Sequence, residues 1–434
     1  MKFLERLRNV SFWSLDYLKG GKVLKHYNDI KFITENYNKS KAIREKYLNN
    51  ILTHAVSNTE YYKTSAHFKS LKDFPVINKN TVLDNFEQFK AKSYITKKSK
   101  LISTSGSTGV PLKLIHDSIK KNRNTADTIY FSELSGFKVG YKLLLIRHWR
   151  AAFIKSPILS WMQNIRPIEV VDLNDKNISK LITSIEKDSS SLGLLSNASA
   201  LEMICKYLDK VTSKSIKSNL TSIIANSEAL NHYTKQAMKK YFNVVTVSRY
   251  SNMENGLLAM QKMDNNNEFQ INWASYYIEI LKLDSNMPVH QGEMGRIVVT
   301  DYFNHAMPLI RYDTGDIGAF KYNSDPPEFD KVEGRKSDVI LKTNGDILSS
   351  LIIGEVNSFS GIKQSQLIQE TKNGYKIVLN VNSKFKHEKE LINKFKSFLG
   401  DDAEVIIEYV NEIPLLNSGK RKTTINNYLT HTNS

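Results

Sequence analysis

The chain has 434 residues, of which 41% are hydrophobic and 24% are charged, so it can bury a large core and is not disordered. Its length is typical of two or three domains. The single cysteine, Cys205, falls in a helical pattern as a buried apolar residue, and it excludes a disulfide framework and a cysteine-based metal site. We recognise neither a signal peptide nor a membrane-spanning stretch, so we expect a soluble, cytoplasmic protein.

Lysine and arginine exceed aspartate and glutamate by 17, and the first hundred residues hold 20 basic against 9 acidic side chains. A basic region of this kind attracts an anionic membrane face, nucleic acid or a phosphorylated substrate, or it is only a solvated surface. No nucleic-acid-binding motif accompanies the charge, so we expect no nucleic-acid partner. A weak peripheral membrane contact through the basic N-terminus stays open.

Taken in chain order, the residues up to about 70 have helical periodicity. Within residues 41–56, for example, Ile43, Tyr47 and Ile51 fall on one face of a helix. A further helix is expected over 117–134.

Strands alternate with helices in the next part of the chain. Apolar segments predict strands there at 141–147, 192–195, 220–228 and 244–250. Helical patterns follow the second and the third of these segments. The alternation predicts an α/β core with mostly parallel sheets. Consecutive strands at 276–281 and 295–300 then predict an attached β subdomain.

The segment from Leu101 to Pro111 is rich in hydroxyl residues and glycine. Its centre consists of six consecutive residues, Thr104, Ser105, Gly106, Ser107, Thr108 and Gly109. Small residues let backbone N–H groups turn toward an anion, and hydroxyl groups add donors, so the composition suits a phosphate-binding loop. A flexible linker has the same composition. The short length and the apolar flanks favour the loop, although it lacks the pattern of a Walker loop or a dinucleotide fingerprint.

The segment from Tyr250 to Gly256 ends a predicted strand with a turn. This turn places Glu254 at the carboxyl edge of the sheet, where open α/β sheets bind ligands. A carboxylate at this edge can hold Mg²⁺, which takes one or two carboxylates together with phosphate oxygens. Considered without other motifs, Glu254 is an acid in a surface loop.

Three more segments combine charge with glycine. Residues 311–316 contain two carboxylates, and Asp316 could accept hydrogen bonds from ribose hydroxyl groups; the alternative is an Asp/Gly turn between strands. Gly334 and Arg335 lie in a pattern typical of a hinge or domain boundary. Lys420, near the end of the chain, is a mobile point charge able to meet a phosphate or a carboxylate, or it belongs to an ordinary basic tail.

Together these segments resemble the motifs of the adenylate-forming superfamily, which contains acyl-CoA ligases, adenylation domains of peptide synthetases and luciferases. The motifs follow one another in the order Thr104–Pro111, Tyr250–Glu254, Tyr312–Asp316, Gly334–Arg335 and Gly419–Lys420. The chain is most similar to the phenylacetate-CoA ligase branch, which includes capsule-biosynthesis CapK proteins and coenzyme F390 synthetase-like proteins. Residues 54–62 and 74–79 add to this resemblance, which extends over nearly the whole chain.

The resemblance implies that ATP activates a carboxylic acid as an acyl-adenylate with release of pyrophosphate. Transfer of the acyl group to CoA or another thiol would follow. The implied roles are phosphate binding by 104–109, Mg²⁺ binding by Glu254, ribose binding by Asp316 and Arg335, and bridging of the acid and the α-phosphate by Lys420. The implied ATP site further contains Glu228, Tyr250 and Ser251.

The resemblance also implies two domains. An N-terminal domain over 1–333, with the basic helical region 1–70, would bind ATP and the acid. A small, mobile α+β domain over 334–434 would carry Lys420 and swing between an adenylating and a thiolating pose. At the hinge the superfamily usually has Asp or Lys, and this chain has Ser337, so thioester formation is less firmly implied than adenylation.

The motifs leave the acid and its acceptor open. From their positions at predicted strand ends, we expect His148, Ser196, Asn226 and Asn252 to line the pocket for the acid. The expected acid is small or aromatic, and the expected pathway makes a surface polysaccharide or a secondary metabolite. The acceptor is CoA, a carrier-protein thiol or an amino sugar. The alternatives are a ligase that forms an amide or ester directly, and a catalytically silent binding or scaffold homologue at the membrane face.

Overall fold

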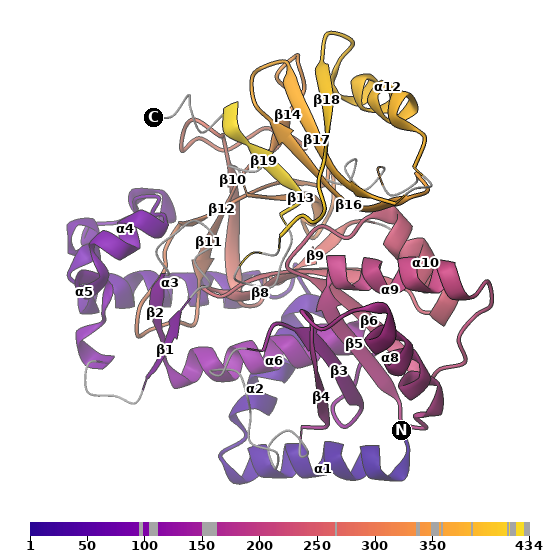
Figure 1. The fold of residues 1–434 in the computed structure, drawn as a ribbon. Helices are drawn as coiled ribbons and strands as arrows, with labels where there is room; N and C mark the ends of the chain where they lie inside the picture. The colour runs from indigo at the N-terminus through magenta and orange to yellow at the C-terminus, as the bar shows by residue number, and fades with distance from the viewer. Residues whose placement is uncertain are drawn as a thin grey trace.

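The computed structural model describes residues 1–94, 99–103, 112–149, 163–264, 267–335, 339–348, 356, 359–382, 385–414, 416 and 422–428. An eleven-stranded sheet forms the centre of the molecule, and a four-stranded sheet near the C-terminus stands above it in Figure 1. The strand order in the large sheet is β10-β11-β12-β13-β9-β8-β7-β6-β5-β3-β4. The predicted α/β class is therefore confirmed.

Five neighbouring strands at one end of the large sheet are parallel. They are β3 (Lys142–Arg147), β4 (Ile165–Glu169), β5 (Leu192–Asn197), β6 (Leu220–Asn226) and β7 (Thr246–Asn252). The helices of this region are α8 (Asp175–Lys187), α9 (Ala198–Val211) and α10 (His232–Phe242). Because the strands are parallel, their carboxyl ends meet at one edge of the sheet, as the alternation of strands and helices predicts.

The remaining strands continue the same sheet with antiparallel pairing. They are β8 (Gly256–Gln261), β9 (Phe269–Ile271), β10 (Tyr276–Leu281), β11 (Gly295–Asp301), β12 (Tyr312–Phe320) and β13 (Phe329–Arg335). The two strands that predict an attached β subdomain are β10 and β11. Both lie in the large sheet, so the β region extends the central sheet, which is parallel at the β4 end and antiparallel at the β10 end.

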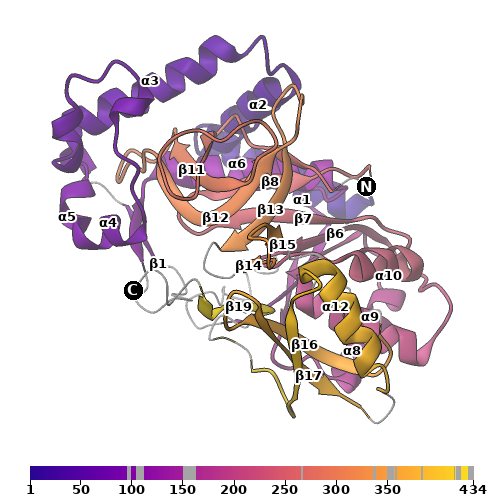
Figure 2. The same ribbon diagram turned by 90° about the horizontal axis from the view of Figure 1, so that it is seen from above.

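Different helices cover the two faces of the parallel strands. Helices α8, α9 and α10 bury one apolar cluster, which includes Leu144, Leu194 and the predicted buried residue Cys205. Helices α2 and α6 bury another on the opposite face, around Tyr130 and Val247. The view from above separates α9 and α10 on one side from α2 on the other (Figure 2). Because alternate residues of a strand point to opposite faces, a polar residue at a strand end faces either the layer of α8, α9 and α10 or the layer of α2 and α6.

Helices dominate the first hundred residues, as predicted. They are α1 (Phe3–Leu18), α2 (Lys22–Glu35), α3 (Lys41–Asn58), α4 (Lys79–Asp84) and α5 (Phe86–Phe89), with short 3-10 turns at Tyr61–Ser65, Leu71–Asp73 and Lys92–Tyr94. Helix α6 (Ser118–Leu134) begins after Asp117, whose side chain accepts a hydrogen bond from the Lys120 N–H and caps the helix. Within the described ranges, no helix is both long and apolar enough to cross a bilayer.

A two-stranded hairpin precedes α6. Its strands are β1 (Lys100–Ser103) and β2 (Lys113–His116), and Ser103 pairs with Lys113. The connection between them, 104–111, lies outside the described residues and contains the predicted phosphate loop. The hairpin therefore locates the two ends of that loop.

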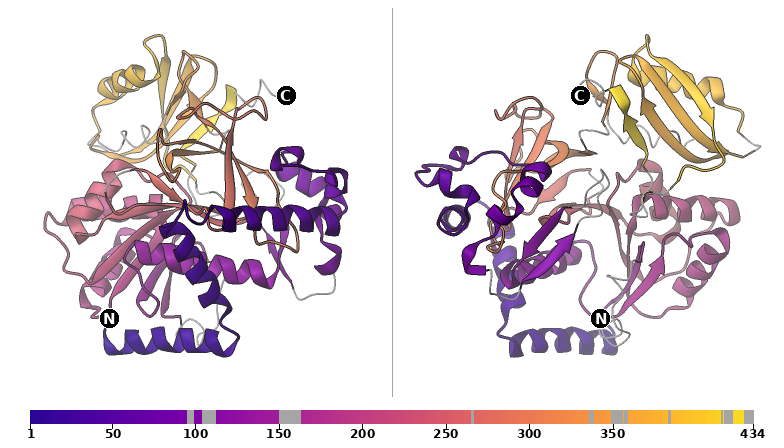
Figure 3. Two further views of the ribbon diagram at one scale, coloured as in Figure 1. Left: turned by 180° about the vertical axis from the view of Figure 1, so that it is seen from behind. Right: turned by 60° about the vertical axis from the view of Figure 1, so that its left-hand side comes forward.

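The C-terminal region has its own sheet and core. Its elements are β14 (Ile340–Leu341), β15 (Ile347–Leu348), β16 (Ile362–Gln369), β17 (Gly374–Val381), α12 (Glu388–Leu399), β18 (Glu404–Tyr409) and β19 (Thr424–Asn426). The apolar cluster of this region, around Leu379, Leu391 and Phe395, takes its members from residues 340–407. Figure 3 shows the region at the end of the molecule opposite to α1.

Candidate active site

The turn between β7 and β8 presents Glu254. Asn252 stabilises this turn, because its Oδ1 accepts a hydrogen bond from the Asn255 N–H at 2.8 Å. His116, the last residue of β2, donates from Nε2 to the Glu254 carbonyl oxygen at 3.0 Å; since a carbonyl only accepts, Nε2 carries the proton. Glu254 is only 6% exposed. Its backbone is thus held from two sides, one of which is the stem of the predicted phosphate loop.

Asp316 is the centre of a second group. The Tyr250 hydroxyl donates to Asp316 Oδ2 at 2.8 Å, and Arg335 Nε lies 3.4 Å from Asp316 Oδ1. Arg335 Nη1 also donates to the Thr314 carbonyl oxygen at 2.6 Å. Tyr250, Asp316 and Arg335 belong to β7, β12 and β13, so the fold brings together residues that are far apart in the sequence.

Tyr312 connects this group to Glu254, because its hydroxyl donates to Glu254 Oε1 at 3.4 Å. Burial raises the pKa of Glu254, while the charge of Arg335 acts in the opposite direction. The nearby charge of Asp316 raises the pKa of Arg335. The site therefore combines a buried carboxyl group that resists ionisation with a guanidinium that stays charged.

A β-bulge in β12 sets the position of Asp316. Arg296 pairs with Ile317 and Val298 pairs with Asp313, so three residues of β12 lie opposite one residue of β11. Gly315 lies in this bulge with φ +76°, and a Cβ there would stand 2.8 Å from Arg335 Nη1. The alternative interpretation of 311–316 as a turn between strands is thus wrong, because Tyr312–Phe320 is a continuous strand whose irregularity is a bulge.

Glu254 is a suitable residue for holding Mg²⁺ in the way the motif implies. The described part of the chain contains no group of three or more His, Cys, Asp or Glu side chains arranged as a complete metal site. A single carboxylate fits Mg²⁺ when phosphate oxygens and water supply the other ligands. The chemistry of this donor agrees with a metal that arrives together with a nucleotide.

A row of polar residues crosses the carboxyl edge of the parallel strands. Asn197 pairs with Asn226, and Asn226 pairs with Arg249, so the three side chains share one face of the sheet. Asn226 Oδ1 and Arg249 Nε are buried and have no hydrogen-bond partner among the described residues. Burial lowers the pKa of Arg249 to about 10, with a contribution from the charge of Arg147 on β3. Two guanidinium groups therefore face a polar, unsatisfied part of the sheet edge.

Other predicted site residues have separate surroundings. His148 Nδ1 lies 3.1 Å from Glu169 Oε1 at the β4 edge of the sheet. Ser196 is fully buried, and the strand alternation turns it to the face opposite to Arg249. Glu228 accepts a hydrogen bond from the Ser199 N–H at 2.8 Å, so it holds the start of α9. Ser251 lies in β7, next to Tyr250.

Several predicted residues lie outside the described part of the chain. They are the loop residues 104–109, Ser337 and Lys420. The described chain resumes at Lys422, whose carbonyl oxygen accepts from Gln366 Nε2 at 2.7 Å. The roles expected for these residues stay predictions.

Sequence reasoning missed a buried polar network on α6. Lys120 Nζ lies 2.6 Å from Asp301 Oδ2, and both side chains are fully buried. Lys120 also donates to the Tyr276 hydroxyl, which in turn donates to the Asn255 carbonyl oxygen at 2.6 Å. These contacts also hold the Glu254 turn, in addition to those of Asn252 and His116. The spacing of the buried polar residues Asp117, Lys120, Arg123 and Asp127 along one helix face is the signal that could have revealed it.

Comparisons with known proteins agree with the fold. Residues 340–427 match the CapK C-terminal domain family. Protein CapK of Staphylococcus aureus is 22% identical over 82% of this chain and 80% of its own length. The phenylacetate-coenzyme A ligase of Escherichia coli (strain K12) is 23% identical over 32% of this chain and 35% of its own. Among solved structures, 2-hydroxyisobutyryl-CoA ligase has 14% identity and a TM-score of 0.70 in its postadenylation state, covering 92% of this chain and 91% of that one. In its thioesterification state it has 15% identity and a TM-score of 0.57, with 92% of each chain covered.

The fold is that of 2-hydroxyisobutyryl-CoA ligase, and together with the sequence similarity to CapK and phenylacetate-CoA ligase it indicates the adenylate-forming superfamily, as the motifs predict. Within the superfamily, its sequence is similar to CapK and to phenylacetate-CoA ligase, the branch that the motifs indicate.

Proposed function

We propose that the protein uses ATP to activate a carboxylic acid as an acyl-adenylate, with release of pyrophosphate, and transfers the acyl group to a thiol such as CoA. The convergence of Tyr250, Asp316 and Arg335 next to Glu254 is the observation that carries this proposal. Asp316 would accept hydrogen bonds from the ribose hydroxyl groups, and Arg335 would hold it in place. Mg²⁺, when bound with the nucleotide, would neutralise phosphate charge beside Glu254.

Residues 104–109 would bind the phosphates of ATP. The hairpin stem supports this role, because His116 at its end contacts the backbone of Glu254. Backbone N–H and hydroxyl donors of the loop would hold the departing pyrophosphate. Lys420 would place its charge between the acid's carboxylate and the α-phosphate, where negative charge develops during the transfer.

The row formed by Asn197, Asn226 and Arg249 favours an acid with a second anionic group. Arg249 has an unsatisfied buried Nε, and the charge of Arg147 acts on it. A purely apolar acid beside Arg249 would leave its buried Nε without a hydrogen-bond partner, which costs free energy. A carboxylate or phosphate on the far end of the acid would accept a hydrogen bond from Arg249 Nε. The small acid expected from the sequence would thus carry a second anionic group.

The C-terminal region would act as the moving part. Its separate apolar core within 340–407 supports this, as does the last pair of the large sheet, Asp316 with Arg335, after which the chain leaves that sheet. We propose a domain boundary directly after Arg335, two residues later than the boundary between 333 and 334 that the resemblance implies. The TM-score is higher against the postadenylation state of 2-hydroxyisobutyryl-CoA ligase than against its thioesterification state, which supports an arrangement of the two parts like that of the postadenylation state.

The proposal is tested by measuring pyrophosphate release over a panel of carboxylic acids, with and without CoA, a carrier protein or an amino sugar. We expect acid-dependent release that falls by orders of magnitude in Lys420→Ala, while ATP binding by calorimetry persists. Release that is unchanged by the substitution would remove Lys420 from the reaction. Release without CoA consumption, followed by amide or ester formation, would favour the direct ligase. An absence of release with every acid would favour the silent homologue.

A further inference from the structure

Helix α1 turns its apolar side outward. Phe3 is 80% exposed, Tyr17 76% and Leu18 79%. The other large apolar residues exposed on this helix are Leu4, Leu7, Val10 and Leu15. An exposed helix of a globular protein normally turns its apolar stripe to the core, so this arrangement is inverted.

The acidic residues of the same helix face the protein. Glu5 is 2% exposed, and its Oε1 accepts a hydrogen bond from the Ser191 N–H at 2.7 Å. Asp16 accepts from the N–H groups of Val23 and Leu24 at 3.1 and 2.9 Å, so it caps the first turn of α2. These polar contacts, together with the ring contact between Trp13 and Tyr27 of α2, attach α1 to the rest of the molecule.

The attachment is close and specific. Asn9 Nδ2 donates to the Val139 carbonyl oxygen at 3.0 Å. A Cβ on Gly140, whose φ is +99°, would stand 2.2 Å from the Glu5 carbonyl oxygen, so only glycine allows the helix to lie this near. The apolar side is consequently presented on a fixed support.

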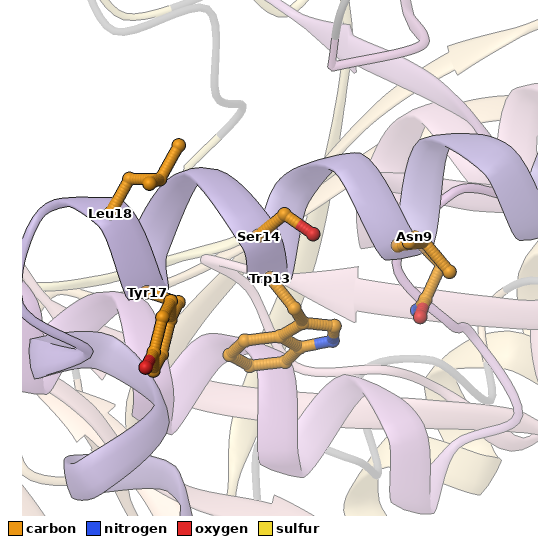
Figure 4. Close-up of a pocket in the computed structure, with 6 residues that line it drawn as sticks. Asn9, Trp13, Ser14, Tyr17 and Leu18 are labelled. Atoms are coloured by element: carbon orange, nitrogen blue, oxygen red, sulfur yellow. The ribbon is translucent and has the colours of Figure 1, made fainter.

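Within residues 1–25, every exposed charge is positive. Residues 1–25 contain six basic side chains, Lys2, Arg6, Arg8, Lys19, Lys22 and Lys25, and their two acids are the buried Glu5 and Asp16. Trp13 and Tyr17 flank a shallow groove of α1, which is drawn in Figure 4. Apolar residues, interfacial aromatic residues and cations without exposed acids are the combination by which helices lie in anionic lipid surfaces.

We propose that α1 docks the protein on an anionic phospholipid surface, with the helix lying in the plane of the headgroups. Phe3, Leu7 and Leu18 enter the boundary between headgroups and acyl chains, and the surrounding cations contact lipid phosphates. The C-terminal region lies at the opposite end of the molecule in Figures 1 and 3, so docking leaves it facing away from the bilayer. This proposal is independent of the proposed enzymatic activity.

The test is flotation of the full-length protein with vesicles of phosphatidylcholine alone and of phosphatidylcholine with phosphatidylglycerol. We expect binding to the anionic vesicles only, weakened by salt. Leu7→Gln/Leu18→Gln and Arg6→Glu/Lys22→Glu should each lower the bound fraction at least about tenfold. Matched controls at equally exposed positions far from α1, Met287→Gln/Ile406→Gln and Lys386→Glu/Lys389→Glu, should bind like the unmodified protein.

Three outcomes of the flotation test would overturn the proposal. They are a lack of binding to anionic vesicles, equal binding to neutral vesicles, and equal losses in the control variants. Sedimentation of the protein without lipid tests whether a second copy of the chain, and not a membrane, covers the apolar side of α1. A dimer that Leu7→Gln/Leu18→Gln converts to a monomer would assign the apolar side to self-association and also contradict membrane docking. Circular dichroism of each variant verifies that the protein still folds.

Discussion

At the scale of single residues, the site depends on groups whose ionisation is shifted by burial. His116 is 4% exposed, and burial lowers its pKa from 6.5 to about 4, with a further contribution from Lys120. The neutral ring keeps its Nε2 hydrogen bond to the Glu254 carbonyl oxygen at physiological pH. His116 is thus a positioning residue for the Glu254 turn.

The unfolded chain binds a proton on His116 near pH 6.5, whereas the folded protein binds it only near pH 4. The burial of His116 therefore does not lower the free energy of unfolding above pH 6.5, and this free energy falls as the pH drops toward 4. The shift corresponds to about 3 kcal/mol. We expect His116→Gln to flatten the dependence of the free energy of unfolding on pH in this window, measured by urea denaturation. His67→Gln, at an exposed position, is the control and should leave the slope unchanged. Equal slopes in all three proteins would contradict the assignment.

Arg249 carries the prediction about the acid. We expect Arg249→Met to lower kcat/KM for acids with a second carboxylate, such as succinate, at least about tenfold relative to butyrate, because a charged hydrogen bond is lost. Arg249→Lys should retain part of the preference. The measurement is pyrophosphate release, with Arg166→Met at an exposed arginine of β4 as the control. A uniform loss with every acid would mean that Arg249 only supports the fold.

At the scale of elements, α6 connects the N-terminal helices to the site. Arg123 donates to Ser275 Oγ at 2.7 Å and pairs with Asp29 of α2 at 2.5 Å. Lys120, three residues earlier on α6, is fully buried, as is its partner Asp301 at the end of β11. A buried charge that loses its partner is costly, although the intact pair adds little net stability.

We therefore expect Asp301→Ala to lower the free energy of unfolding by about 3–5 kcal/mol, because Lys120 keeps a buried charge without compensation. Lys120→Met/Asp301→Leu should recover most of this loss, since both charges are removed. Glu45→Ala breaks the exposed Lys41–Glu45 pair and is the control, with an expected effect of less than about 1 kcal/mol. A loss of unfolding free energy in Asp301→Ala as small as that in Glu45→Ala would show that water reaches Lys120.

The same scale shows how far elements could be predicted. The strands β3, β5, β6 and β7 and the helix α6 follow from apolar runs and periodicity, because each segment encodes its own burial. The joining of β10 and β11 to the large sheet does not follow, because strand pairing depends on residues distant in the chain. The inverted orientation of α1 is likewise invisible locally, since an amphipathic pattern does not say which side is covered.

At the scale of the whole molecule, the two parts touch where Lys206 Nζ of α9 donates to the Lys363 carbonyl oxygen of β16 at 3.3 Å. We expect Lys206→Cys/Lys363→Cys, joined by a bismaleimide, to retain single-turnover pyrophosphate release and to lose thioester formation. The reason is that the second step would require the C-terminal region to rotate. Each single-cysteine variant treated with the reagent is the control, and Cys205 is buried. Thioester formation at an undiminished rate in the linked protein would contradict the hinge.

The sequence by itself indicated the superfamily and the α/β class, and it predicts Glu254, Asp316 and Arg335 as site residues, because short motifs keep chemical groups at fixed local spacing. Only the tertiary structure decided that Tyr312 links Glu254 to the Asp316 group and that His116 supports the Glu254 turn. The same holds for the alignment of Asn226 with Arg249 and for the outward-facing apolar side of α1. The reason is physical: these contacts join segments separated by many residues, and their energies depend on burial and register that no single segment contains.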